Sequence, residues 1–176
     1  IASHPFIQRV HYDVGCGTGS LVKLLNADGW KSGGCDPSTS MVAKARLKND
    51  NCSIQIGSCC DYQPISDCTL ITATNDVINH LGSANELRMF LKRTYEFLSA
   101  DGFLIFDTVT PQDIRNNWNG YIQIDKRERY TLVRTGSVVS DYQGLLRYDF
   151  YCHDVNKKMW TVETEEHLVT TYELPM

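Results

Sequence analysis

As far as about residue 109, short apolar runs alternate with segments whose apolar residues recur every three or four positions. The apolar runs predict a strand that begins at Val10 and further strands at residues 30–36, 53–57, 68–74 and 103–109. Helical spacing predicts helices after Gly19, at residues 39–48 and from Ser83 to Leu98. Strands that alternate with helices form a parallel sheet with right-handed crossovers. The predicted fold class is therefore α/β, with an open parallel sheet and flanking helices.

The pattern changes after residue 109. Residues 111–120 form a polar segment, predicted to be a loop or a short helix. Apolar and polar residues then alternate over residues 146–153, which predicts a strand, and a turn-like segment follows at residues 154–157. Residues 159–172 are predicted to form the second strand of a hairpin, running back beside the first. This pattern predicts an antiparallel insertion. We expect an α/β core at residues 1–109 and an antiparallel extension of the same domain at residues 110–176.

A glycine-rich turn follows the first strand, and residues 10–20 read V-H-Y-D-V-G-C-G-T-G-S. Gly15, Gly17 and Gly19 allow backbone conformations and close approaches that a side chain forbids. The spacing is G-x-G-x-G, and Ser20 stands where a dinucleotide fingerprint has its third glycine. The turn therefore favours a cofactor other than a dinucleotide. A turn that only joins a strand to a helix remains the structural alternative.

Residues 13–19 resemble the first motif of class I S-adenosylmethionine-dependent methyltransferases. The resemblance implies a Rossmann-like fold in which the glycine turn passes under the methionine and ribose of S-adenosylmethionine. It also implies that the acid before the turn helps to hold the methionine amino group. The cofactor-binding residues implied by this motif are Asp13, Gly15, Cys16, Gly17 and Gly19.

Two later segments resemble the same family. Asp36 ends the second predicted strand, where a carboxylate can accept both ribose hydroxyls, and Pro37 and Met41 continue the motif. An aspartate that only starts a turn is the alternative. After the third strand, the resemblance implies that Asp61 and the backbone N–H of Cys60 contact adenine. A surface carboxylate is the alternative for Asp61.

The segment at residues 75–81 follows the fourth predicted strand, at the end where parallel sheets bind ligands. Asn75 and Asp76 are therefore predicted to contact the cofactor. The segment lacks the prolines and the aromatic residue of base-methylating enzymes, and it resembles the D-x-x-N-Y-L form of small-molecule methyltransferases. His80 replaces the tyrosine of that form.

Two histidines are candidate catalytic residues. Imidazole titrates near neutral pH, so His80 could accept a proton from the acceptor. His167 lies in the returning strand, within a segment close to the E-x-H-x-x-x-x-Y form of amino-sugar N-methyltransferases. A structural hydrogen bond for His80 and a half-exposed strand position for His167 are the alternatives.

Composition narrows the possible partners. A net charge of -4 and a pI near 5.7 argue against nucleic acid as a partner. Seven cysteines without a C-x-x-C pair favour reduced thiols, and no metal site is predicted. No apolar run approaches the ~20 residues of a membrane helix, and the sequence does not begin with a signal pattern. A cytoplasmic protein without a membrane partner is therefore expected.

The motifs together predict an S-adenosylmethionine-dependent methyltransferase that acts on a nitrogen or oxygen of a small-molecule acceptor and releases S-adenosylhomocysteine. The antiparallel extension resembles the sheet that walls the acceptor pocket in small-molecule N-methyltransferases. A non-catalytic S-adenosylmethionine-binding regulatory module and a nicotinamide-dependent oxidoreductase are the alternatives. The family fold ends with a helix and two further strands, which we expect to lie outside this sequence. The acceptor and the oligomeric state are not predicted.

Overall fold

The computed structural model describes residues 8–64, 67–153 and 159–172. The chain divides into two compact units, which span residues 1–108 and 109–176. We call them the first unit and the second unit and describe each by itself.

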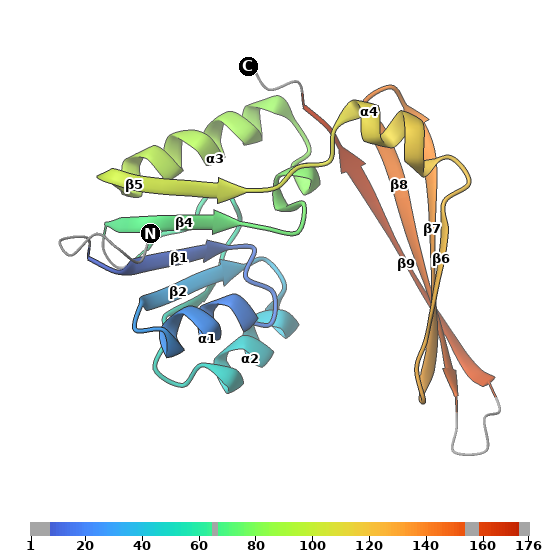
Figure 1. Cartoon of the computed structure of the whole chain (residues 1–176), viewed down its shortest axis with the longest axis horizontal. Helices are drawn as coiled ribbons and strands as arrows, with labels where there is room; N and C mark the ends of the chain where they lie inside the picture. Colours follow the sequence, from blue (N-terminus) through green and yellow to red (C-terminus); the bar gives the residue numbers. More distant parts are fainter. Residues whose placement is uncertain (1–7, 65–66, 154–158, 173–176) are drawn as a thin grey trace. The chain divides into compact units, whose positions relative to one another are not determined.

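The first unit contains a five-stranded parallel sheet in the order β3-β2-β1-β4-β5 (Figure 1). Its strands are β1 (Val10–Val14), β2 (Lys31–Asp36), β3 (Ile54–Ile56), β4 (Cys68–Ala73) and β5 (Leu98–Phe106). The strand order reverses between β1 and β4, and ligands of open α/β sheets bind outside the carboxyl ends of the strands at such a reversal. The predicted α/β class is confirmed, and the fold places a candidate site at the ends of β1 and β4.

Helices cover the sheet. They are α1 (Ser20–Ala27), α2 (Thr39–Lys48), the 3-10 helix η1 (Val77–His80) and α3 (Ala84–Phe97). The Ser38 side chain accepts a hydrogen bond from Met41 N and begins α2, and Ser83 begins α3 in the same way. Among the described residues, no helix is both long and apolar enough to cross a membrane.

Two apolar clusters hold these layers together. Figure 1 shows α1 and α2 side by side, and their buried residues Val22, Val42 and Ala45 pack in one cluster with Cys16 and Ile54. A separate aromatic cluster joins β1 to α3: the Tyr12 ring stacks on Tyr62 at 5.6 Å, and Tyr62 in turn contacts Phe90 and Phe97. Because side chains alternate along β1, His11 and Asp13 point away from the face that carries Tyr12.

The apolar run at residues 103–109 is typical of a buried strand, and the structure corrects this interpretation. Phe103 is 54% exposed and Ile105 is 45% exposed. The physical reason is position: β5 is the last strand of the sheet, and only its alternate residues face the packed layer. The strand also begins earlier than predicted, because Leu98 already pairs with Cys68, and the register shifts between Leu98 and Phe103.

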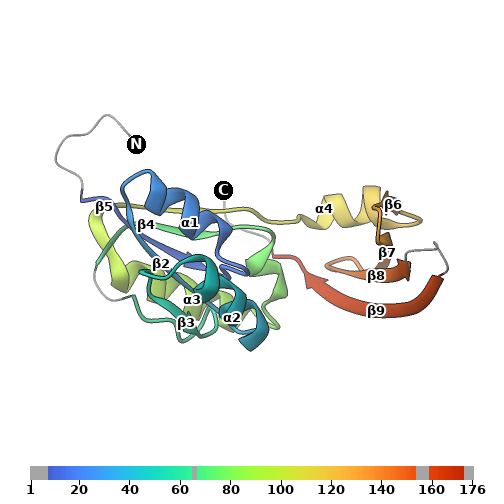
Figure 2. The same cartoon turned by 90° about the horizontal axis from the view of Figure 1, so that it is seen from below.

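The second unit contains a four-stranded antiparallel sheet in the order β6-β7-β8-β9. Its strands are β6 (Ile122–Lys126), β7 (Tyr130–Ser140), β8 (Gln143–His153) and β9 (Met159–Thr170). The predicted hairpin corresponds to β8 and β9, which run side by side with β9 strongly curved (Figure 2). The turn predicted at residues 154–157 lies outside the described residues. The alternation of apolar and polar residues is weaker over β6 and β7, so only the strand pairing in the structure shows that the sheet has four strands.

A short helical segment packs on one end of this sheet. It consists of α4 (Pro111–Asp113) and the π-helix η2 (Ile114–Trp118). Ile114 and Trp118 form a buried cluster with Val169 of β9. The indole Nε1 of Trp118 donates to Asp113 Oδ2 at 3.0 Å. A Cβ atom added to Gly144 of β8 would overlap the Trp118 ring, so the glycine is required by close packing.

Replacement of Gly144 by alanine should destabilise the second unit by about 1–3 kcal/mol, because the new methyl group displaces the Trp118 ring. Urea unfolding followed by tryptophan fluorescence measures the loss. Gly82→Ala is the matched control, since its added Cβ would come no closer than 3.7 Å to the flexible Glu86 side chain. Equal stability of both variants would contradict the packing described here.

Candidate functional site

The glycine turn after β1 begins where two strands meet. The N–H groups of Gly15 and Cys16 both donate to the carbonyl of Cys35 at 2.8 Å, which fastens the turn to the end of β2. Gly15 has a φ of 75°, and a Cβ added there would lie 2.5 Å from Val77 Cγ2. The glycine therefore allows η1 to pack directly against the turn.

Gly17 is the open position of the turn. Its φ is 52°, and an added Cβ would meet no atom within 4 Å. The Gly17 N–H donates to Asp36 Oδ2 at 2.9 Å, while the other oxygen, Oδ1, accepts from Ser38 N at 2.9 Å. The Asp36 carboxylate thus holds the turn and the start of α2 together and leaves free space beside Gly17. This bridging role was not predicted from the sequence.

Gly19 closes the turn against α2. Its φ is 71°, and an added Cβ would lie 2.6 Å from Asn49 Nδ2. The buried Asn49 amide donates to the carbonyls of Gly19 at 3.1 Å and Ala45 at 2.8 Å. Lys48 Nζ also reaches the turn and donates to Thr18 Oγ1 at 2.9 Å. Sequence reasoning missed both contacts, because Asn49 and Lys48 lie about 30 residues from the turn and belong to no motif.

Asp13 is a buried carboxyl group at the end of β1, only 4% exposed. Thr72 Oγ1 of β4 donates to Asp13 Oδ1 at 2.5 Å. Burial raises the pKa of Asp13 to about 6, the negative charge of Asp36 adds to the rise, and the Thr72 hydrogen bond opposes it. The site therefore holds two acidic side chains close to the glycine turn, one of which titrates near neutral pH.

A cavity of about 530 Å³ lies in the first unit near the same end of the sheet. Its lining includes Pro37, Cys59, Cys60, Val77, His80 and Leu81. The structure thus brings together three of the predicted site residues, Pro37, Cys60 and His80, from three separate segments of the chain. Cys59 joins them without having been predicted. The volume falls within the range typical of small-molecule sites.

The loop after β3 is closed by its own side chains. Asp61 Oδ1 accepts from Ser58 N at 2.6 Å and from Ser58 Oγ at 2.8 Å, and these bonds lower the pKa of Asp61. The Cys60 N–H donates to Ser58 Oγ at 3.2 Å. Both groups predicted to contact adenine therefore also hold the loop in shape, and their contact with a ligand stays a prediction.

The segment after β4 adopts an unusual backbone. Asn75 and Asp76 have φ values of 63° and 52°, in the left-handed region that non-glycine residues rarely occupy. Asp76 N donates to Asp107 Oδ2 at 3.1 Å, and Asp76 Oδ2 lies 4.0 Å from His80 Nε2. Such strain is typical of functional positions. The turn aligns a carboxylate with the predicted base.

Two further residues were predicted to belong to the site, Met41 and His167. Met41 is on α2 and is 37% exposed. His167 belongs to the second unit, where its ring meets Tyr148 edge-on with centroids 5.3 Å apart, and its Nε2 lies 3.7 Å from Glu165 Oε2. Their contacts with cofactor and acceptor stay predictions.

Comparison with known protein families identifies the first unit. A family model described as a methyltransferase domain matches residues 12–104, which include the glycine turn, Asp36 and η1. The chain belongs to this methyltransferase domain family. The resemblance inferred from the glycine motif is confirmed.

Two curated relatives share part of this methyltransferase domain. A Geobacillus sp. (strain WCH70) protein named as a methyltransferase is 34% identical over 99 residues, which cover 54% of this chain and 40% of the relative. The ubiquinone biosynthesis O-methyltransferase of Bradyrhizobium diazoefficiens is 28% identical over 113 residues, covering 62% of this chain and 41% of the relative. The chain therefore spans less than half the length of the curated relatives it matches.

Solved structures share the fold. An S-adenosylmethionine-dependent methyltransferase from Clostridium acetobutylicum has a TM-score of 0.81 at 18% identity, over 95% of this chain and 68% of that one. CalS10, an amino pentose methyltransferase from Micromonospora echinaspora solved with its S-adenosylmethionine, has a TM-score of 0.80 at 20% identity, over 97% and 72% of the two chains. At these identities the likeness shows the fold alone.

Replacement of Asn49 by alanine should destabilise the methyltransferase domain by about 1–3 kcal/mol, because the Gly19 carbonyl loses its buried donor. Amide hydrogen exchange of residues 15–20 should also become faster. Urea unfolding and exchange mass spectrometry measure the two effects. Asn51→Ala, at an exposed asparagine two residues away, is the control. Unchanged exchange in Asn49→Ala would show that the amide does not hold the turn.

Proposed function

We propose that this chain binds S-adenosylmethionine and transfers its methyl group to a nitrogen or oxygen of a small-molecule acceptor. The observation that carries the proposal is the open space at Gly17, whose N–H donates to Asp36 in the turn that follows the buried Asp13, at the reversal of strand order. Because the chain spans less than half of its curated relatives, the activity of the whole protein is part of the proposal.

The residues present fit this cofactor. A Cβ added at Gly17 would meet no atom within 4 Å, so the turn leaves open space there for a ligand. Asp13 and Asp36 provide negative charge for a ligand that carries an ammonium and a sulfonium group. The cavity lined by Pro37, Cys59 and Leu81 offers an apolar wall for a nucleoside. Asp36 retains lone pairs for ribose hydroxyls, because each oxygen accepts only one backbone N–H here.

When bound, S-adenosylmethionine supplies a methyl group activated by the sulfonium. The carbon–sulfur bond would break with its electron pair going to sulfur as the acceptor nitrogen or oxygen bonds to carbon, and S-adenosylhomocysteine would be the product. The glycine turn, Asp13 and Asp36 orient the donor, and such positioning can contribute ~7–11 kcal/mol to lowering the barrier. His80 accepts the acceptor's proton, and Asp76, at 4.0 Å from Nε2, orients the ring.

The target atom is supported by the comparisons. The named relatives and structural neighbours include an O-methyltransferase and an amino pentose methyltransferase, which supports oxygen or nitrogen as the target atom.

Replacement of Gly17 by alanine should weaken S-adenosylmethionine binding about tenfold or more, because the methyl group occupies the ligand's space. Isothermal titration calorimetry with S-adenosylmethionine and S-adenosylhomocysteine measures this, and NADH serves as the ligand control. Tight NADH binding without binding of the sulfur compounds would overturn the proposal in favour of an oxidoreductase.

Gly120→Ala is the matched protein control for Gly17→Ala. Gly120 has a φ of 78° and also has no atom within 4 Å of an added Cβ, but it lies in the second unit. Both alanines carry a similar cost of about 1–2 kcal/mol for a left-handed conformation. Only Gly17→Ala should lose affinity, so backbone strain and loss of ligand space are separated.

His80→Ala should lower kcat by about 10²–10⁴-fold for a hydroxyl or protonated amine acceptor and change the affinity for S-adenosylmethionine little. Mass spectrometry of methylated products, with amino sugars and phenols as acceptors, measures the rate. His167→Ala is tested beside it, since His167 is the second predicted base. Binding of the donor without turnover of any acceptor would favour a regulatory module. Full activity of both variants would mean that neither of these two histidines accepts the proton.

A further inference from the structure

A chain of buried side-chain hydrogen bonds crosses three strands and ends on Asp13. Ser32 Oγ of β2 lies 2.6 Å from His11 Nδ1, and His11 Nε2 lies 2.9 Å from Thr72 Oγ1 of β4. Thr72 Oγ1 lies 2.5 Å from Asp13 Oδ1. The strand register explains the alignment, because His11 pairs with Ser32 and Asp13 pairs with Thr72. Each of the four residues is buried, with His11 only 1% exposed.

The donors of this chain can be assigned from the ionised carboxylate. A carboxylate only accepts, so the Thr72 hydroxyl proton points to Asp13. Thr72 Oγ1 then accepts from Nε2–H of His11, and Nδ1 accepts from the Ser32 hydroxyl. All three protons are directed toward Asp13. Burial lowers the pKa of His11 to about 4, so the ring is neutral and carries a single proton near neutral pH.

When Asp13 is protonated, the same pairs of atoms can form the same hydrogen bonds with donor and acceptor exchanged in each pair. The Asp13 O–H then donates to Thr72 Oγ1, the Thr72 hydroxyl donates to Nε2, and Nδ1–H donates to Ser32 Oγ. Conversion to the ionised order releases the Asp13 proton to solvent, rotates the hydroxyls and moves the imidazole proton from Nδ1 to Nε2 by exchange with water. The proton count therefore balances, with one proton lost from the carboxyl group.

We propose that Ser32, His11 and Thr72 are positioning residues that hold the ionised Asp13 carboxylate ready for the ammonium group of the donor, and that the tautomer of His11 switches when this carboxylate ionises. The ligand in this proposal rests on the proposed function. The hydrogen-bond coupling rests only on the geometry of β1, β2 and β4.

Two other titratable side chains interact with Asp13 in the part of the chain that the structure describes. Asp36 at the end of β2 opposes ionisation through its negative charge, and the Cys16 thiol of the glycine turn interacts with both carboxyl groups. The pKa of Cys16 is raised to about 12, so the thiol stays neutral. An ammonium group that binds beside Asp13 and Asp36 relieves the repulsion between them and favours the ionised order.

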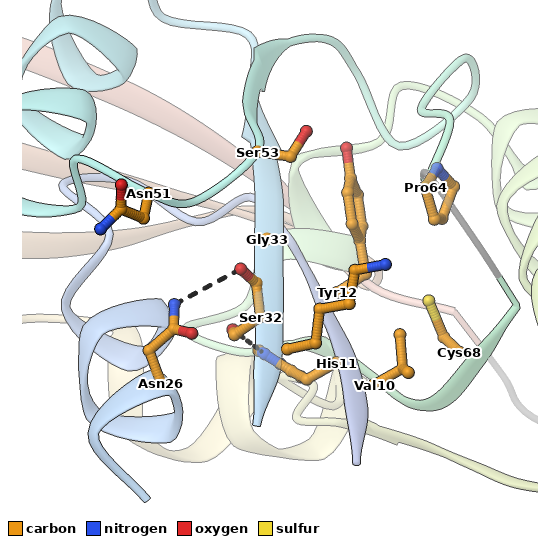
Figure 3. Close-up of a pocket in the computed structure, with 11 residues that line it drawn as sticks. Val10, His11, Tyr12, Asn26, Ser32, Gly33, Asn51, Ser53, Pro64 and Cys68 are labelled. Atoms are coloured by element: carbon orange, nitrogen blue, oxygen red, sulfur yellow. Dashed lines mark hydrogen bonds between the residues drawn. The ribbon is translucent and has the colours of Figure 1, made fainter. Parts of the chain in front are cut away.

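The end of the hydrogen-bond chain at Ser32 borders a small cavity. Figure 3 shows the dashed bond between His11 and Ser32, and both residues line a cavity of about 130 Å³ together with Asn26 and Asn51. Polar residues around this space allow water to exchange protons with Ser32 and His11. The hydrogen-bond chain therefore connects the cavity at the start of the strands with the glycine turn at their ends.

The test is the tautomer of His11, measured by long-range ¹⁵N–¹H NMR of the whole chain, with His11→Gln used to assign the signal among the five histidines. In the free protein, the ring should change from the Nδ1–H to the Nε2–H form as pH rises through the pKa of Asp13, which burial raises to about 6. Saturation with S-adenosylmethionine near pH 5 should produce the Nε2–H form. A single tautomer under all these conditions would overturn the proposal.

Variants test the effect on binding. With the Asp13 pKa near 6, the affinity for S-adenosylmethionine should be about tenfold weaker at pH 5 than at pH 7, because only the ionised carboxylate binds the ammonium. Thr72→Val keeps the side-chain shape but removes the donor, so the midpoint of this pH profile should rise by about one unit and the affinity at pH 5 should fall about tenfold. Thr72→Ser should restore both to within about threefold.

Thr69→Val is the matched control, because it removes a hydroxyl from the same strand that contacts Gln8 and Val10 instead of Asp13. A Thr72→Val profile identical to that of Thr69→Val would overturn the proposal. The proposed function fails separately: a wild-type chain whose His11 tautomer follows pH but that binds no S-adenosylmethionine would support the coupling and overturn the assigned ligand.

Discussion

The site depends first on the Asp36 carboxylate. Its two oxygens accept the N–H groups of Gly17 and Ser38, and these bonds connect the glycine turn to the start of α2. Hydrogen bonds to a charged acceptor contribute more than those between neutral groups, about 1.5–3 kcal/mol each. The Asp36 side chain therefore holds the shape of the turn and also places a negative charge beside Gly17.

Two carboxyl groups close together in a buried site are unfavourable by themselves. Burial and the charge of Asp36 raise the pKa of Asp13, while Thr72 donates a hydrogen bond that favours ionisation. The balance leaves Asp13 close to its titration point near neutral pH. A cationic ligand completes such a site, because it compensates both charges. The same arrangement would repel a pyrophosphate, which agrees with the absence of the dinucleotide fingerprint from the glycine turn.

Close backbone approach explains the rest of the site. Gly15 admits Val77, and Gly19 admits Asn49, so η1 and α2 both pack onto the glycine turn. Asn75 and Asp76 occupy left-handed conformations immediately before η1, which brings His80 to the cavity wall. In the second unit, Gly144 admits Trp118 in the same manner. These three glycines thus allow η1, α2 and the Trp118 ring to pack where they do.

The sequence by itself determined the local elements and the position of the glycine turn. Periodicity and turn residues are local properties, so β1, β4, α2, α3 and the β8–β9 hairpin could be predicted from residues close in the chain. The acids Asp13 and Asp36 followed from their place at predicted strand ends. Tertiary structure decided which distant residues meet them. Thr72, His11, Ser32 and Asn49 reach the site through strand register and helix packing over 20 to 60 residues, and no local pattern records such pairings. Exposure of Phe103 on β5 likewise depends on which layers cover a strand, and apolar character alone does not reveal that.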